Sequence, residues 1–214
     1  MANSISQEDI LKIKTGLSDS KSANRRSAAK KIGQKRITEL GDDLFKAYLK
    51  EKEDIRTWET QTAMICALGK IGYKNAIPEL NKILELNKEH DAITSRAASA
   101  FIRITRKNKN DASPVINLIE NGKLSILNGA TSVLTYDDMI PSDEEIIKII
   151  DFFNSKDEKD LVFIGAGDPR SYLISAMSKW KKELTIDYLN KFINDSRLKT
   201  YAILALEGKK SRYE

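Results

Sequence analysis

The segments RSAAKKIG (Arg26–Gly33), TAMICALG (Thr62–Gly69) and RAASAF (Arg96–Phe101) align as three copies of one pattern. Equivalent positions in the copies lie 33 to 36 residues apart, and the same spacing separates Phe101 from Leu134. Each copy places small residues beside a large apolar residue, which is typical of a helix that packs closely against its counterpart in the next repeat. The sequence therefore predicts a series of repeated helices.

A second helix is expected after each copy. Apolar residues recur at helical spacing in 76–86 and in 112–119, and each segment has a proline in its first turn, where a missing N–H is tolerated. Further along the chain, Ser142 and Glu145 stand three residues apart, as in a capping box, ahead of an apolar stripe. Each repeat is therefore predicted to be a helix, a tight turn and a second helix.

Glycine, aspartate and proline mark the predicted helix ends. Gly33, Gly69 and Gly72 stand where the first helices should end, because glycine adopts the left-handed conformation of a C-cap without steric cost. Asp168 and Pro169 should begin another first helix, with aspartate as the N-cap and proline at the first helical position. These signals divide the chain into five to six units.

The strings ALGKIGYKNAIPEL (Ala67–Leu80), NRRSAA (Asn24–Ala29) and DPR (Asp168–Arg170) resemble the HEAT-like repeat of the kind also found in phycobilin lyases. The resemblance implies an all-α fold, a right-handed α-α superhelix (HEAT-like repeat solenoid) of five to six helical pairs. The resemblance is specific for the fold. It does not identify a function, because repeats of this class serve in scaffolds, adaptors, inhibitors and a few enzymes.

We expect one HEAT-like repeat domain over residues 1–214. The repeat is most regular over 20–154, and 155–167 is expected to be an irregular insertion. No linker rich in serine, glycine or proline interrupts the chain, which contains only four prolines and ten glycines. The composition is therefore that of one continuous helical unit.

Composition also limits where the protein acts. No run of eighteen apolar residues occurs, so no membrane-spanning helix and no membrane partner are expected. The N-terminal segment is polar and acidic, unlike a secretory signal. The single cysteine, Cys66, cannot form an internal disulfide and is expected to be a small core residue in a reducing compartment. We therefore expect a cytoplasmic protein.

No group of residues points to catalysis. His90 is the only histidine and lies in an expected loop, so neither a zinc site nor a Ser/His/Asp arrangement is predicted. The segment LVFIGAG (161–167) resembles a strand entering a phosphate-binding turn, but it lacks the third glycine and the surrounding alternation of strands and helices. We expect no catalytic residue, no cofactor and no metal, and no small-molecule substrate is indicated.

The net charge of +5 arises in the first 50 residues, which contain eleven Lys or Arg and six Asp or Glu. The segment 21–36 has seven cations and no acid. A solvated helix face accounts for this pattern, and so does a surface that binds an acidic protein or phosphates. The candidate partner-binding residues are Arg25, Arg26, Lys30, Lys31, Lys35, Arg36, Arg103 and Arg106.

Two functions from different classes remain open. The first is a non-enzymatic protein-binding module, which would act as a scaffold or as an inhibitor such as an immunity protein that neutralises a toxin. The second is a nucleic-acid-binding protein similar in architecture to HEAT-like DNA glycosylases for alkylated bases, with Trp58 and Trp180 as the available indoles. The first is favoured, because the excess charge is confined to one end of the chain and no carboxylate pairs with either indole in a recognisable motif.

Overall fold

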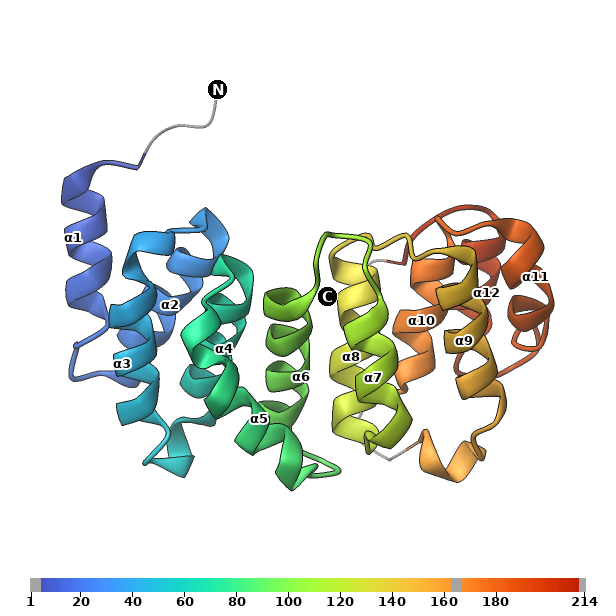
Figure 1. Ribbon diagram of the computed structural model, residues 1–214, viewed down its shortest axis with the longest axis horizontal. Helices are drawn as coiled ribbons and strands as arrows, with labels where there is room; N and C mark the ends of the chain where they lie inside the picture. The colour runs from blue at the N-terminus through green and yellow to red at the C-terminus, as the bar shows by residue number, and fades with distance from the viewer. Residues whose placement is uncertain (1–4, 163–166, 212–214) are drawn as a thin grey trace. The chain divides into compact units, whose positions relative to one another are not determined.

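The computed structural model describes residues 5–162 and 167–211, and these residues form twelve α-helices and no strand (Figure 1). The expected all-α class is confirmed. Among the described residues, no helix combines the length and the apolar character that crossing a membrane would need. The chain divides into two compact units, of which unit 1 comprises the residues up to Leu86 and Ala92–Ile104, and unit 2 comprises Asn87–Asp91 and the residues from Thr105 onward. The single domain expected over 1–214 stays a prediction.

Unit 1 is built from six helices in its described part. They are α1 (Gln7–Gly16), α2 (Ser22–Lys35), α3 (Gly41–Glu51), α4 (Trp58–Ile71), α5 (Ile77–Leu86) and α6 (Ala92–Thr105), the last of which ends one residue inside unit 2. The helix α4 packs against both α2 and α3, and α1 packs against α2. We call α2, α4 and α6 the even row of this unit, and α1, α3 and α5 its odd row.

Unit 2 repeats the same alternation in its described residues. Its helices are α7 (Ser113–Asn121), α8 (Leu124–Tyr136), α9 (Asp143–Asn154), α10 (Pro169–Met177), α11 (Lys182–Asn190) and α12 (Lys199–Leu206). The even row of unit 2 is formed by α8, α10 and α12, with α10 packed against both neighbours. The odd row is formed by α7, α9 and α11, with α9 packed against both neighbours.

Short 3₁₀ turns join several of these helices. They span Thr38–Leu40, Ile55–Thr57, Lys74–Ala76 and Glu158–Asp160. The first three connect an even helix to an odd helix, or the reverse, inside unit 1. The fourth lies within the segment 155–167, which the sequence marks as irregular, so the described part of that segment contains a turn but no α-helix.

Small residues bring the even helices of unit 1 into close contact. A Cβ atom built on Gly33 would lie 3.0 Å from the Cα of Ala67, and one built on Gly69 would lie 2.6 Å from the Cα of Ala100. Because the opposing atoms belong to the backbone, they cannot move aside as a flexible side chain could. The close approach predicted from the small residues of the repeat is therefore confirmed in unit 1.

The role predicted for two of the glycines is wrong. Gly33 and Gly69 lie inside α2 and α4 and do not cap them. The left-handed C-caps are Arg36, with a φ of 52°, and Gly72, with a φ of 68°, each three residues further on. Gly72 is therefore confirmed as a cap, whereas Gly33 and Gly69 are required where the neighbouring helix leaves no space for a side chain.

Local signals for helix starts are confirmed. The hydroxyl of Ser142 accepts a hydrogen bond from the backbone N–H of Glu145, whose carboxylate accepts one from the N–H of Ser142. Asp168 accepts a hydrogen bond from the backbone N–H of Arg170, and Pro169 is the first residue of α10. Both caps satisfy amide groups that a helix N-terminus would otherwise leave without a partner.

The two tryptophans differ in burial. Trp180 is buried, and its Nε1 donates a 2.8 Å hydrogen bond to the carbonyl oxygen of Met139. Trp58 is 49% exposed because it is the first residue of α4 and precedes the first buried position, Thr60. Cys66 is half-buried on α4, less enclosed than the core position expected for it.

The close approach at Gly69 predicts the effect of a single methyl group. We expect Gly69→Ala to lower the free energy of unfolding by about 2 kcal/mol, because overpacking of this kind costs about 1–3 kcal/mol. Gly33→Ala should cost less, since its Cβ has more room. Denaturant titration of both variants measures the difference. Equal or greater stability of Gly69→Ala would contradict the packing argument, because helix propensity alone favours alanine by about 1 kcal/mol.

Candidate binding surfaces

Charged residues are divided between the two rows of unit 1. The even row contains eight Lys or Arg, of which α2 contributes five, α6 two and α4 one, and its single acid is Glu59. The odd row contains five Lys and seven Asp or Glu. The excess of positive charge in unit 1 is therefore a property of one row of helices.

Arg25 is a structural residue. Its Nε lies 2.5 Å from one carboxylate oxygen of Glu51 and its Nη2 lies 2.8 Å from the other, while Nη1 donates to the carbonyl oxygens of Asp19 and Ser20. Burial alone would raise the pKa of Glu51, but hydrogen bonds from Arg25, Thr57 and other donors outweigh it and lower that pKa. Because its charge is paired with Glu51, Arg25 offers less charge to a partner than the sequence indicates, and its role in binding stays a prediction.

Arg26 is also paired, through an ion pair with Glu59 of α4. Glu59 is the only acid in the even row of unit 1, so this pair uses the one carboxylate that α2, α4 and α6 offer. The pair joins neighbouring helices and is partly exposed. Arg26 therefore contributes less free positive charge than the sequence indicates.

The remaining predicted cations of α2 and of its C-cap are exposed. Lys30, Lys31, Lys35 and Arg36 form no ion pair with any residue that the structure describes. Two exposed cations of the same row that the sequence did not single out are Lys70 of α4 and Arg96 of α6. The Cδ of Lys70 lies 3.3 Å from the place of a Cβ on Gly33, so this side chain runs along α2. We call these six residues the basic surface.

The second predicted cluster is divided between the units. Arg103 belongs to unit 1, where it lies half-buried on α6 of the even row. Arg106 belongs to unit 2, and its Nη2 lies 2.8 Å from a carboxylate oxygen of Asp137, with both side chains 17% exposed. Arg106 is therefore held by an acid of its own unit, which satisfies much of the charge that the sequence assigned to a partner.

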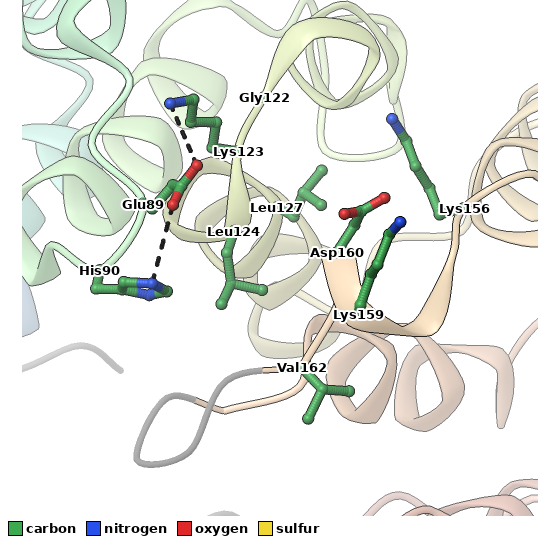
Figure 2. Close-up of a pocket in the computed structure, with 10 residues that line it drawn as sticks. All are labelled: Glu89, His90, Gly122, Lys123, Leu124, Leu127, Lys156, Lys159, Asp160 and Val162. Atoms are coloured by element: carbon green, nitrogen blue, oxygen red, sulfur yellow. Dashed lines mark ion pairs between the residues drawn. The ribbon is translucent and has the colours of Figure 1, made fainter.

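Unit 2 contains a cavity of about 320 Å³ that is lined by residues of three connecting segments, 87–91, 121–125 and 155–162, and by Leu127 of α8 (Figure 2). The segments 87–91 and 121–125 are tied together by side chains. The amide of Asn87 accepts from the N–H of Lys123 and donates to the carbonyl oxygen of Asn121, while the hydroxyl of Ser125 donates to the carbonyl oxygen of Glu89. Bonded residues lie 34 to 36 apart in sequence, which is the repeat spacing.

Charges around this cavity largely satisfy one another. Figure 2 shows Glu89 between Lys123 and His90, with its carboxylate oxygens 3.2 Å from the Lys123 Nζ and 4.0 Å from the His90 Nε2. The Nζ of Lys156 lies 4.7 Å from the centre of the Phe152 ring. We therefore assign no ligand to this cavity. The sequence segment 161–167 reaches it at Val162, and residues 163–166 lie outside the described residues.

Within residues 5–162 and 167–211, no three His, Cys, Asp or Glu side chains gather as ligands of a metal ion would. The expectations of no metal, cofactor or catalytic residue stay predictions. No known protein-family model and no curated protein matches this sequence.

The repeat register is the signal that would have found the missed cations. Neither Lys70 nor Arg96 has another Lys or Arg within three residues, so no local run of charge marks either of them. When Gly33 is aligned with Gly69, however, Lys70 follows Gly69 as Gln34 follows Gly33, on the exposed side of an even helix. The repeat register therefore places Lys70 on the exposed side of an even helix, whereas a search for basic runs misses it.

The Arg25–Glu51 pair predicts a pH dependence of stability. The pKa of Glu51 is lower in the folded chain than its ordinary value near 4.5, so its contribution is present above about pH 5 and is lost as the pH falls through the folded pKa. We expect Glu51→Gln to lower the free energy of unfolding at pH 7 by about 2 kcal/mol, because it leaves a partly buried guanidinium without its charge partner. Its stability should also fall less steeply than that of the wild type on acidification.

The control is Lys30→Ala, an exposed position in α2, which should change stability by less than about 0.5 kcal/mol. Denaturant titrations at pH 7, 5 and 3.5 measure all three proteins. A Glu51→Gln variant that is as stable as the wild type at pH 7, with a parallel loss at low pH, would show that the pair contributes nothing.

Proposed function

We propose that this protein is a non-enzymatic binding module of HEAT-like repeats, whose helix pairs form a right-handed α-α superhelix of five to six pairs. Support for the repeat comes from the alternation of even and odd helices in each unit. Hydrogen bonds between equivalent parts of successive repeats also support it, since Ala112 donates to Glu145 and Lys191 to Asn154, over 33 and 37 residues. Repeats of this kind offer long surfaces to a partner.

The proposed partner is a protein with an acidic surface, and the basic surface of unit 1 would bind it. One observation carries this proposal. The cations of α2 that pack against other helices, Arg25 and Arg26, are paired with Glu51 and Glu59, whereas the six residues of the basic surface have no ion-pair partner among the described residues. Surface charge of one sign attracts an oppositely charged partner and speeds its association.

The composition between the cations favours protein over nucleic acid. Ala23 and Ser27 are exposed on α2, and Ala63 and Cys66 are partly exposed on α4. Small and weakly polar side chains of this kind can pack against another protein at the centre of an interface that has a charged rim. The helix α2 contains no aromatic residue on which a base could stack. An inhibitor such as an immunity protein would use a surface of this type.

Charge reversal on α2 tests the proposal. We expect Lys30→Glu with Lys31→Glu to reduce capture of the partner from nuclease-treated native lysate by about tenfold, because each lost attraction at an interface is worth up to a few kcal/mol. Quantitative mass spectrometry of the captured proteins measures the loss. The thermal midpoint should stay close to that of the wild type, since both lysines are exposed and form no ion pair with a described residue.

The matched control is Lys46→Glu with Lys50→Glu on α3, two exposed lysines of the odd row that change the net charge equally. This variant should capture the partner as the wild type does. Equal loss in both variants would show a general effect of charge and would contradict a specific surface. Binding of a 20-base-pair DNA duplex at 150 mM salt that is lost in the α2 variant alone, with no protein captured, would instead establish the nucleic-acid function.

A further inference from the structure

The odd row of unit 2 has the opposite charge to the basic surface. Its helices α7, α9 and α11 contain seven Asp or Glu and two Lys. The even row of the same unit contains Arg170 and Lys199 and no acid. Negative charge in unit 2 is therefore gathered on the odd helices, on α9 above all.

An open groove of about 410 Å³ lies between α7 and α9. Its apolar side chains are Ile119, which is buried, and Ile116 and Phe152, which are half-buried. Its polar lining consists of Glu120, Lys148, Asp151 and Ser155. The groove therefore combines an apolar floor with two carboxylates and one ammonium group.

An exposed apolar residue stands on the same helix. Ile147 of α9 is 46% exposed. It lies four residues before Asp151, so the two residues are on the same face of the helix, one turn apart. Ile147 does not line the groove itself, and it adds exposed apolar surface on the helix that forms one side of the groove.

The two carboxylates of the groove stand where they do not favour their own helices. Glu120 lies in the last turn of α7, and Asp151 lies in the last turn of α9. The C-terminal end of a helix carries partial negative charge, so an acid there is unfavourable by about 0.3–1 kcal/mol. Neither residue forms an ion pair with a described residue. Helix stability therefore does not explain either acid, whereas a cationic ligand would.

We propose that the groove between α7 and α9 binds a cationic amphipathic segment of a partner protein. An apolar side chain of that segment enters between Ile116 and Phe152, and its Lys or Arg side chains pair with Glu120 and Asp151. Docking of an amphipathic helix into an apolar groove is a common mode of peptide recognition, with charges at the rim setting its direction. This inference does not depend on the basic surface, because it concerns another unit and the opposite charge.

A second copy of this chain does not supply the segment. Its most basic helix is α2, but that helix buries its apolar side chains, Ala28, Ala29 and Ile32, in its own unit. The exposed side chains of α2 are cations and small or polar residues such as Ala23 and Ser27, so this helix offers no large apolar side chain to the groove. We therefore assign the groove to a segment of another protein that carries both cations and a free apolar face.

A designed peptide pair tests the proposal on the full chain. The first peptide has fifteen residues of Leu and Lys arranged so that one helical face is apolar, and the second replaces each Lys with Glu; both carry a fluorescent label. We expect fluorescence anisotropy to show at least about tenfold tighter binding of the Lys peptide. We expect Glu120→Lys with Asp151→Lys to weaken that binding by about tenfold or more, because two attractions become repulsions.

The thermal stability of the Glu120→Lys, Asp151→Lys variant gives a second readout. Because lysine is favourable in the last turn of a helix, its thermal midpoint should equal or exceed that of the wild type. The matched control is Glu183→Lys with Asp187→Lys on α11, two exposed acids of the same row, which should leave binding within about twofold. Ile116→Ala, which changes no charge, should also weaken binding, since it removes part of the apolar floor.

Three results would each overturn the proposal. Equal weakening by the groove variant and the α11 control would mean that net charge alone attracts the peptide. Full binding by Ile116→Ala, or equal binding of the Lys and Glu peptides, would mean that the groove does not hold an amphipathic segment. If the charge variant proves unstable, Ile116→Ala and the peptide pair still decide the matter.

Discussion

The approach of backbone to backbone between even helices is the constraint on which the rest of unit 1 depends. With Gly33 facing Ala67 and Gly69 facing Ala100, the helices α2, α4 and α6 approach so closely that neither glycine position has space for a side chain. Their remaining faces are therefore fixed, and side chains on those faces cannot retreat into the core. The six residues of the basic surface, on these helices and at the C-cap of α2, are exposed, so the packing of the even helices places positive charge on the surface of the unit.

Much of the helical pattern could be predicted from the sequence because its causes are local. Ser142 and Asp168 cap their helices through bonds to residues two or three positions away, and Gly72 ends α4 through its own backbone conformation. The function of Gly69 could not be predicted in this way, because the atom that excludes a side chain belongs to Ala100. A glycine near the end of a helical pattern has two explanations, and only the neighbouring helix distinguishes them.

The candidate site was predictable as a region but not as a set of residues. A basic run in 21–36 is evident, yet Arg25 is satisfied by Glu51, 26 residues away, and Arg26 by Glu59. Such pairs join different helices and leave no local trace in the sequence. The same limit concealed Lys70, whose side chain lies against Gly33 of the preceding repeat. Charge segregation between rows appears only when helices are grouped by packing instead of by order in the chain.

The backbone conformation of Arg36, the C-cap of α2, is one that favours glycine over arginine. Arg36 ends α2 in a left-handed conformation, which costs a residue with a Cβ atom roughly 1 kcal/mol. The equivalent residue 36 positions later is Gly72, which adopts the same conformation at no such cost. Two successive repeats thus meet one geometric demand with different residues. The first accepts local strain and retains a guanidinium on its surface, at a place where glycine would have served the fold better.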